Sequence, residues 1–377
     1  MMVRPLDVSD VPISTVEAAN GFGLDLFQKM YITAPGENWV VSPASLWFVL
    51  SMAIGGARGS TLDEMRHAMK LGDDYSLVDL GRLRAVEASM GLDQIVRIGN
   101  LLAVHDQYHL LPTFVNFCKD VMGAEAWELD FGDQASADRI NSWISDVTSG
   151  KIIDLVQGLS PADKLMLVNA VYLKAQWKKK FTDAVPDEFD SPGGKGPCQM
   201  MHKTEDLRYT KGDGWQAVKI PYTDNRLSMM IVLPDADVDL QRMVSTMDLD
   251  DLKMIGRSAM KVKVNLQMPR FKVERTMAGD MMQALKDAGM KSAFGGGADF
   301  SAMSGVADLF VSQVVQKAVV EVDEVGTEAA AATAMTFMIK SATVTQEIGL
   351  RIDRPFFYSI SDDLTGLVLF NGVVNRP

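Results

Sequence analysis

A segment near the C-terminus, residues 321–337 (EVDEVGTEAAAATAMTF), constrains the fold of this chain more than any other part of the sequence. Its central part contains Gly326, Thr327, Glu328, Ala329, Ala330, Ala331 and Ala332. By intrinsic propensity, an alanine run forms a helix. By alternation, the same segment places an uncharged face on one side, as a strand inside a crowded sheet requires: Thr327, Ala329, Ala331, Thr333, Met335 and Phe337. Compatibility with both structures predicts a chain that changes conformation, and a short surface helix is the alternative.

The distribution of expected elements favours the α+β class over a doubly wound sheet. Residues 227–234 and 261–273 are rich in β-branched and alternating apolar residues, which predicts strands, whereas residues 276–290 show helical apolar spacing with a glycine near the end. The 377 residues are 47% hydrophobic and 23% charged, which is typical of a soluble protein with a large core. We find no linker, repeat or charge run that would mark a domain boundary.

The charge of the chain argues against a nucleic-acid partner. The formal net charge is −12, and a phosphate backbone is bound by clustered lysine and arginine. Lys178, Lys179 and Lys180 form the only tight basic cluster in the sequence, and such a short run predicts a solvated strand end. The apolar runs are also too short to span a bilayer, so no membrane partner is expected.

The two cysteines and the N-terminus bear on the cellular compartment. Cys118 and Cys198 do not make a disulfide framework, and two free thiols are expected, with a single bridge as the alternative. The first twenty residues lack the apolar stretch of a signal peptide, and no Asn-x-Ser/Thr acceptor for glycosylation occurs. A prokaryotic or an intracellular origin fits these features best.

No catalytic, metal or cofactor site is predicted. The chain has four histidines, His67, His105, His109 and His202, without a Gly-x-Ser-x-Gly or His-Glu-x-x-His motif. His105 and His109 are four residues apart, but no third metal ligand follows. The glycine-rich residues 295–305 lack the Lys-Ser/Thr pair of a phosphate loop, and a structural loop is expected there.

The segment from Glu324 onward resembles the mobile hinge of the serpin family, in which an acidic residue and any residue precede Gly-Thr-Glu and a run of small residues. Residues 350–360 (LRIDRPFFYSI) resemble the C-terminal signature of the same family. Further stretches resemble serpin motifs in the expected order: 38–65, 141–156, 167–181, 215–235, 268–274 and 369–377. The resemblance covers nearly the whole chain.

This resemblance implies the serpin fold, which is α+β, with a large central mixed sheet, further sheets and surrounding helices. It implies one domain over residues 1–377 and an exposed reactive-centre loop at about 325–349. It also implies a suicide-substrate inhibitor of serine proteases with a metastable fold, expected to be a monomer. From that role a secreted or cell-surface protein is expected, with the cytoplasm as the alternative. A protease would cut the loop and form an acyl-enzyme, and the freed hinge would insert into the central sheet.

The hinge residues fit such an insertion. We expect Thr327 to leave water and enter the sheet first, and a charged residue on its face would have to be desolvated. Gly326 is expected to permit a reversal of the backbone at the base of the insertion. A non-inhibitory serpin that acts as a binding or chaperone protein is the alternative function, and a loop that serves only as a sacrificial substrate is another.

The scissile bond can be placed in two ways. Counting forward from Glu324 by the usual family spacing gives Lys340–Ser341, and a lysine there suits a trypsin-like protease with an acidic specificity pocket. A shorter downstream segment would place the bond near Ala342, Thr343 or Val344, which suit an elastase. The forward count is preferred because the insertion mechanism fixes that length. As a further alternative, Lys340 is only a solvated loop residue.

Overall fold

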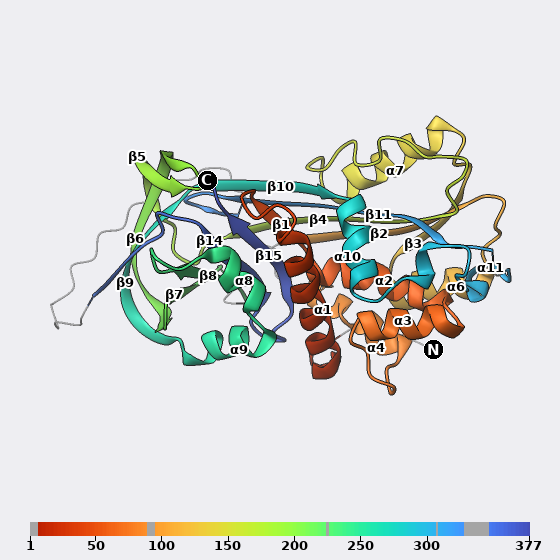
Figure 1. The fold of residues 1–377 in the computed structure, drawn as a ribbon, viewed down its shortest axis with the longest axis horizontal. Coiled ribbons are helices and arrows are strands. Elements are labelled where there is room, and N and C mark those ends of the chain that lie inside the picture. The colour runs from red at the N-terminus through yellow and green to blue at the C-terminus, as the bar shows by residue number, and fades with distance from the viewer. Residues whose placement is uncertain (1–6, 89–94, 224–225, 307, 328–346) are drawn as a thin grey trace.

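Two β-sheets form the frame of the molecule, and helices cover them (Figure 1). The computed structural model describes residues 7–88, 95–223, 226–306, 308–327 and 347–377. The helices are η1 (Val8–Asp10), α1 (Ile13–Tyr31), α2 (Pro43–Gly56), α3 (Gly59–Ala68), α4 (Leu77–Arg82), α5 (Arg84–Ala88), α6 (Pro112–Asn116), the π-helix η2 (Phe117–Met122), α7 (Gln134–Val147), α8 (Leu240–Thr246), α9 (Leu249–Ser258), α10 (Gly279–Asp287), η3 (Ser292–Phe294) and α11 (Ser301–Ser304).

A six-stranded sheet runs along the long axis of the molecule in the order β10-β11-β12-β4-β2-β3. Its strands are β10 (Phe271–Met277), β11 (Val311–Val322), β12 (Gly326–Thr327), β4 (Leu165–Gln176), β2 (Ile95–His105) and β3 (Glu125–Leu129). The sheet is mixed, because β11 runs parallel to β4 and β2 parallel to β3, whereas the other pairs are antiparallel. Glu321 lies at the end of β11, an inner strand.

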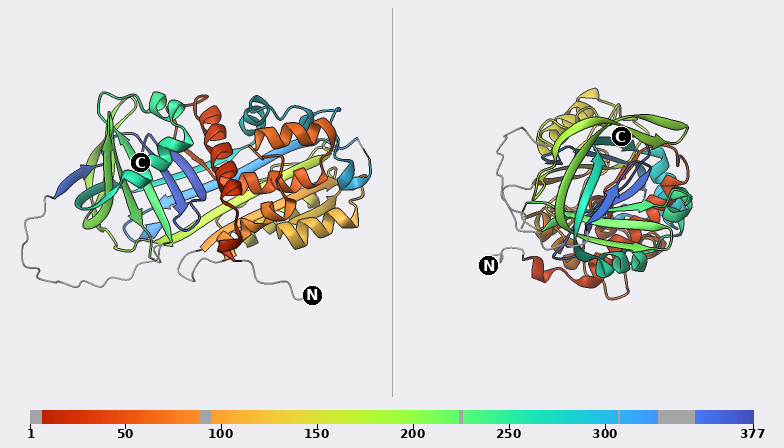
Figure 2. Two further views of the ribbon diagram at one scale, coloured as in Figure 1. Left: turned by 90° about the horizontal axis from the view of Figure 1, so that it is seen from below. Right: turned by 90° about the vertical axis from the view of Figure 1, so that its left-hand side faces the viewer.

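A nine-stranded sheet gathers at one end of the molecule, and α2, α3 and α6 lie at the other end (Figures 1 and 2). Its order is β1-β15-β14-β8-β7-β6-β9-β13, and β5 pairs with β6. The bounds are β1 (Trp39–Val41), β5 (Thr182–Ser191), β6 (Gly194–Gly212), β7 (Trp215–Pro221), β8 (Leu227–Pro234), β9 (Met260–Pro269), β13 (Ile348–Arg351), β14 (Phe356–Asp362) and β15 (Val368–Val374). The two sheets and the irregular helix placement confirm the predicted α+β class.

The six-stranded sheet carries apolar residues on both faces. In β4, Leu165 and Leu167 face a large core that extends to the nine-stranded sheet, whereas Met166 and Val168 face a smaller core. The smaller core lies under α7, whose Ile144 is fully buried there. Continuous apolar runs are what a strand buried on both faces requires. Both cores therefore rest on one sheet, and the single domain over 1–377 stays a prediction.

Several local predictions can be compared with the described residues. The helix predicted within residues 276–290 is α10, and Gly289 follows it with a left-handed φ of 106°, as a helix-terminating glycine often does. Residues 295–305 are mostly loop, although the predicted loop also contains the short helix α11. Both cysteines are free and buried, as predicted, and burial raises the pKa of Cys118 to about 12. No helix in the described part of the chain is long and apolar enough to cross a membrane.

Candidate functional site

The short strand β12 lies between β11 and β4 at one end of the six-stranded sheet. Thr327 pairs with Val322 of β11 and with Ala175 of β4. Farther along, β11 and β4 pair directly with each other, from Val311 with Leu165 to Val319 with Tyr172. The sheet therefore already separates two of its central strands at this end and keeps them hydrogen-bonded over the rest of their length.

Gly326 is required by a close approach of two backbones. A Cβ atom at this position would lie 2.1 Å from the carbonyl oxygen of Ala175 and 2.5 Å from the Cα atom of Gln176, so any side chain would force β12 away from β4. In this conformation Gly326 does not have a left-handed φ, and its expected role in a backbone reversal during insertion stays a prediction. The chain turns before it, where Asp323 donates its backbone N–H to the carbonyl of Gly326 at 2.9 Å.

Thr327 is fully buried, with none of its surface exposed. Its hydroxyl oxygen lies 2.8 Å from the hydroxyl oxygen of Tyr222, which is also fully buried. The prediction that Thr327 leaves water on insertion is therefore wrong for this conformation. Backbone pairing on both sides and a buried hydrogen-bond partner hold Thr327 in the sheet.

Trp177, directly after β4, holds the turn that leads to β12. Its indole ring stacks on Tyr222 with ring centroids 4.5 Å apart and an interplanar angle of 7°. The indole N–H donates to the carbonyl of Asp323 at 2.9 Å, and the backbone N–H of Trp177 donates to Val325 at 2.9 Å. The ring is almost completely buried, and a buried indole N–H needs such an acceptor. One side chain thus fixes both the turn and the tyrosine that bonds Thr327.

Glu324 anchors the same turn through charge. Its carboxylate accepts hydrogen bonds from the Arg270 guanidinium, at 2.8 Å for Nε, and from the backbone N–H of Ala184 at 2.7 Å. Burial raises the pKa of Glu324, but the hydrogen bonds and the positive charge of Arg270 outweigh it, so the net pKa lies below the ordinary value of 4.5. The backbone carbonyl of Glu324 also accepts from Phe181 at 2.9 Å. Two parallel hydrogen bonds between a guanidinium and a carboxylate fix the relative orientation of the two groups and also stabilise their contact.

A buried lysine lies behind these aromatic residues. The ammonium of Lys203 is 4.4 Å from the ring centroid of Phe181 and 5.5 Å from that of Trp177. It pairs with Glu205 at 3.1 Å and donates to the carbonyl of Lys179 at 3.2 Å. Burial lowers the pKa of Lys203 to about 8, with Glu205 opposing that shift. The turn at residues 323–326, called the hinge turn below, is therefore held by the stacked pair Trp177 and Tyr222, and the desolvated ammonium of Lys203 lies close to Trp177.

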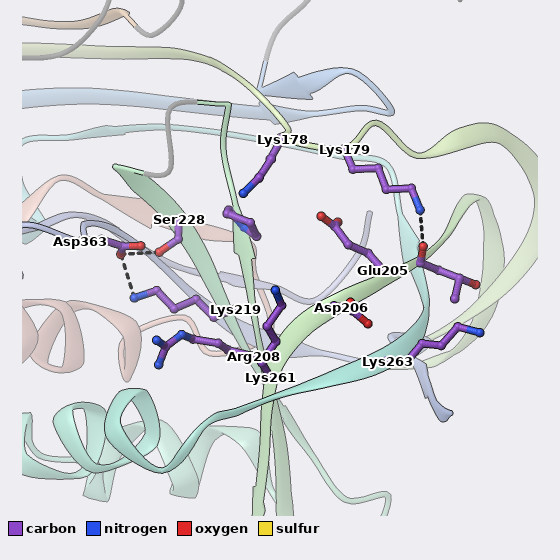
Figure 3. Close-up of a pocket in the computed structure, with 12 residues that line it drawn as sticks. Lys178, Lys179, Glu205, Asp206, Arg208, Lys219, Ser228, Lys261, Lys263 and Asp363 are labelled. Atoms are coloured by element: carbon purple, nitrogen blue, oxygen red, sulfur yellow. Dashed lines mark hydrogen bonds and ion pairs between the residues drawn. The ribbon is translucent and has the colours of Figure 1, made fainter. Parts of the chain in front are cut away.

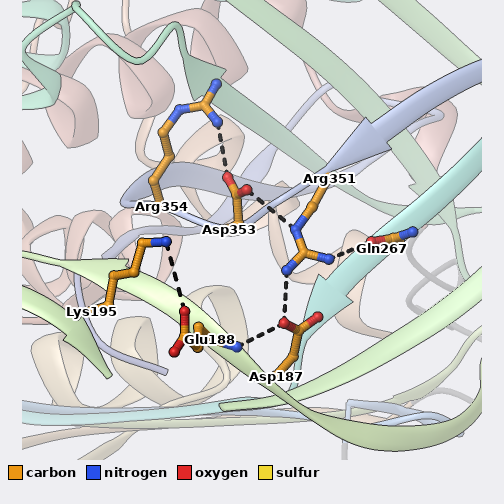
Figure 4. A network of polar contacts seen from close by, with 7 residues as sticks. All are labelled: Asp187, Glu188, Lys195, Gln267, Arg351, Asp353 and Arg354. Carbon is orange, nitrogen blue, oxygen red and sulfur yellow. Dashed lines mark hydrogen bonds and ion pairs between the residues drawn. The ribbon is translucent and has the colours of Figure 1, made fainter. Parts of the chain in front are cut away.

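A second polar network holds the other side of the segment 328–346 (Figure 4). Strand β13 pairs in parallel with β9 at the sheet edge, and its last residue, Arg351, binds three side chains. The distances from its guanidinium are 2.8 Å to Asp187, 3.2 Å to Asp353 and 2.7 Å to Gln267. The hydrogen bond from Arg351 lowers the pKa of Asp187. Residues 327 and 348 are thus both tied to a sheet.

The predicted site residues divide into two groups. The structure brings Glu324, Gly326 and Thr327 together in the hinge turn. The remaining predicted residues lie outside the described part of the chain: Glu328, Ala329, Ala330, Ala331, Ala332, Lys340, Ser341, Ala342, Thr343 and Val344. Their roles, including the position of the scissile bond, stay predictions. Of the histidines considered as metal ligands, His105 lies 3.0 Å from Asp106 and His109 lies 3.2 Å from Glu128.

The residues that hold the hinge were not predicted from the sequence. Trp177, Tyr222 and Arg270 each lie in a stretch that resembles a family motif, yet no local pattern indicates that they meet. The sequence contains only a weak indication of their role, namely that an aromatic residue directly follows an apolar strand at positions 177 and 222. Together these residues position the backbone of the hinge turn and of β12. They hold the first two residues of a strand in an otherwise closed sheet.

Comparison with known proteins agrees with this architecture. The model of the family Serpin (serine protease inhibitor) matches residues 17–377. An uncharacterized serpin-like protein of Thermococcus kodakarensis is 35% identical over 96% of this chain and 85% of its own length. Leukocyte elastase inhibitor of Sus scrofa is 32% identical over 96% of this chain and 99% of its own.

A solved structure shares the whole fold. Human thyroxine-binding globulin superposes with a TM-score of 0.87 at 26% identity, over 96% of this chain and 98% of that one. The sheet that keeps β11 against β4, the hinge turn beside it and the family model over nearly all residues point to one conclusion. This chain belongs to the serpin family.

Proposed function

We propose that this protein inhibits serine proteases by inserting a cleaved loop between β11 and β4. The observation that carries the proposal is the position of Thr327, which already lies between these strands while their remaining length is closed. A strand that continued from Thr327 would enter along the same line. The likeness to leukocyte elastase inhibitor over nearly the whole chain supports an inhibitory role.

In the proposed reaction, the protease supplies the catalytic chemistry. Its active-site serine attacks the carbonyl carbon of the residue before the scissile bond, the amide nitrogen leaves with a proton, and an ester joins protease and inhibitor. We place that bond at Lys340–Ser341, which would suit a trypsin-like protease; a bond near Ala342, Thr343 or Val344 would suit an elastase. Insertion of roughly 15 residues at about 3.3 Å each would then move the protease by on the order of 50 Å.

The inserted segment must suit the inside of the sheet. Continuing the alternation from Thr327, the positions that would share its buried face are small or apolar, with no charge up to Phe337. Desolvating a charge on this face would oppose insertion. Insertion must also outrun hydrolysis of the ester, so an uncharged face is a kinetic as well as a thermodynamic requirement.

The direct test is incubation with trypsin, chymotrypsin and elastase, followed by denaturing electrophoresis and mass spectrometry. We expect a covalent complex that survives SDS and release of the C-terminal peptide, residues 341–377 if the bond is Lys340–Ser341. Cleavage of the loop without a covalent complex, for all three proteases, would contradict the inhibitory proposal.

A matched pair of variants tests insertion itself. Ala329→Arg places a charge on the face that Thr327 shares, whereas Ala330→Arg places the same charge on the opposite face. We expect Ala329→Arg to turn the inhibitor into a substrate and Ala330→Arg to retain most of the covalent complex. Thr327→Arg is a weaker test, because Thr327 is already buried and its replacement would also disturb the uncleaved protein. Equal stoichiometry of inhibition for the two variants would refute the insertion step.

A binding protein without inhibitory activity is the second candidate, because the fold matches human thyroxine-binding globulin closely. In that case the loop would be cut without forming a complex. We further propose that the protein acts as a monomer outside the cell, where an inhibitor of this kind would meet its protease. Light scattering of the purified protein and fractionation of the producing cells would test these two points.

A further inference from the structure

A small cavity lies between α2, α5, β2, η2 and β15. It differs from the open cleft over β6, β7 and β9, where charged side chains predominate (Figure 3). Its volume is about 50 Å³, and its walls are mainly apolar, with Phe48, Met122 and Leu369 among them. At about 10–15 Å³ for each water-sized atom, this volume has room for about four non-hydrogen atoms.

Asn100 of β2 brings an unused hydrogen-bond donor to this cavity. The residue lines the cavity and is only 6% exposed. Its Oδ1 atom accepts a hydrogen bond from Nδ2 of Asn169 at 2.8 Å, which leaves its own Nδ2 atom as a donor. Within the residues that the structure describes, nothing accepts a hydrogen bond from this nitrogen. A buried donor without an acceptor costs free energy, so an acceptor placed in the cavity would be stabilised.

The half-buried guanidinium of Arg84 adds a positive charge to the same cavity. Its Nη1 atom donates to the carbonyl of Val121 at 3.1 Å. Gly123, which follows the π-helix with a left-handed φ of 57°, leaves room for this guanidinium, because a Cβ atom there would lie 2.0 Å from Cζ of Arg84. π-helical turns of this kind occur frequently at functional sites. A cation and an amide donor beside one cavity favour an anionic oxygen.

We propose that this cavity binds a short-chain aliphatic carboxylate. The carboxylate accepts a hydrogen bond from Nδ2 of Asn100 and faces the Arg84 guanidinium, while the short alkyl chain packs against Phe48, Met122 and Leu369. The volume limits the ligand to about the size of acetate or propionate. This inference goes beyond the proposed protease inhibition and does not depend on it.

The probe for the test is sodium propionate, titrated into the intact protein at constant ionic strength with sodium chloride as the balancing salt. We expect saturable binding by saturation-transfer NMR, with a dissociation constant roughly in the millimolar range for so small a ligand. The unfolding midpoint should rise with propionate concentration, since a ligand that binds only the folded state stabilises it. Pivalate carries the same charge on a branched chain that is too large for the cavity, and it should not bind. Absence of saturable propionate binding, or equal binding of pivalate, would overturn the proposal.

The variant Asn100→Asp tests the amide donor. It retains an oxygen that can accept from Asn169 but replaces the donor by a second oxygen, so the affinity for propionate should fall at least about tenfold. The matched control is Asn265→Asp on β9, which makes the same change at an exposed position that does not line the cavity. This control should bind propionate like the wild type. Equal affinity of the two variants would overturn the assignment to this cavity.

The variant Ala44→Val tests the cavity without changing a polar group, and it decides the question if Asn100→Asp fails to fold. Ala44 lines the cavity from α2 and is 4% exposed. The added methyl groups would take up about half of the space, so propionate binding should be lost. Undiminished affinity in this variant would place the binding elsewhere and overturn the assignment. All of these measurements are made without a protease, so their outcome is separate from that of the inhibition test.

Discussion

Glu324 is the residue through which pH should act on the hinge. Its pKa lies below the ordinary value in the folded protein, so its stabilising effect is present above the unfolded pKa and is lost as pH falls through the folded pKa. Protonation of the Glu324 carboxylate would weaken its hydrogen bonds with the Arg270 guanidinium and with the backbone N–H of Ala184. The hinge turn should therefore loosen only in acid, below about pH 4.5.

The variant Glu324→Gln should lower the free energy of unfolding by about 1–2 kcal/mol at pH 7, because Arg270 is half-exposed and water screens part of the interaction. The difference between wild type and variant should shrink between pH 4.5 and pH 3. Denaturant titrations at a series of pH values measure it. The control is Glu321→Gln, at an exposed strand end, which should change little. A difference that is constant down to pH 3 would contradict the assigned role.

Lys203 should affect the stability of the protein at alkaline pH, in contrast to Glu324. Burial lowers its folded pKa to about 8 from 10.5, so the unfolded state binds its proton more tightly and stability should rise as pH increases from 8 to 10.5. The rise should amount to at most about 3 kcal/mol. The measurement is the difference in unfolding free energy between wild type and Lys203→Met across this range. If the difference is flat, the ammonium is not desolvated as the structure indicates.

At the scale of elements, the proposed insertion requires β11 to separate from β4. These strands pair in register over most of their length and carry buried residues on both faces. The parallel ladder between them must open before a new strand can enter, and α7 covers one of its faces. The barrier to opening is therefore distributed over backbone hydrogen bonds and side-chain packing rather than placed in a single residue.

A reversible covalent lock tests this movement. Val168 and Val315 are register partners in β4 and β11, and neighbouring strands at about 4.8 Å lie within the Cα separation that a disulfide tolerates. We expect Val168→Cys/Val315→Cys, in a background with Cys118→Ala and Cys198→Ala, to be cut without forming a covalent complex when oxidised. Reduction of the same sample should restore the complex. A complex of equal yield in the oxidised protein would mean that the strands need not separate.

The sequence predicted the helices and strands better than it predicted which side chains contact each other. Alternation and apolar spacing sufficed for β8, β9, β10 and α10, because these periodicities are local properties of the chain. The hinge motif located Glu324, Gly326 and Thr327, yet the burial of Thr327 could not be predicted, since it depends on Tyr222 more than a hundred positions away. Register between distant strands likewise decides which side chains become neighbours, and local sequence does not contain it.

For the whole molecule, the proposed insertion between β11 and β4 predicts that the uncleaved folded state is not the most stable one. Cleavage in the segment 337–345 would free the residues after Thr327 to extend β12. Each new ladder hydrogen bond would add about 0.5–1.5 kcal/mol, and Met335 and Phe337 would be buried. Kinetic protection, rather than equilibrium, would then preserve the uncleaved form.

The corresponding measurement is the unfolding midpoint before and after limited proteolysis, with cleavage verified by mass spectrometry. We expect a rise of at least about 10 °C, since each kcal/mol shifts the midpoint of a large protein by about 2–4 °C. The cleaved Ala329→Arg protein is the control and should gain much less. An equal or lower midpoint after verified cleavage of the wild type would show that the loop does not insert.

The position of β14 and β15 has a consequence for biosynthesis. These two strands come from the end of the chain, yet they lie between β1 and β8 in the nine-stranded sheet. Until β15 has been synthesised, β1 lacks the one strand that it pairs with among the described residues. The sheet can close only after β14 and β15 have been synthesised, so the nascent protein must keep its apolar strands from aggregating until then. The proposed insertion site between β11 and β4 would therefore form before the nine-stranded sheet is complete, because β14 and β15 follow the hinge in the chain.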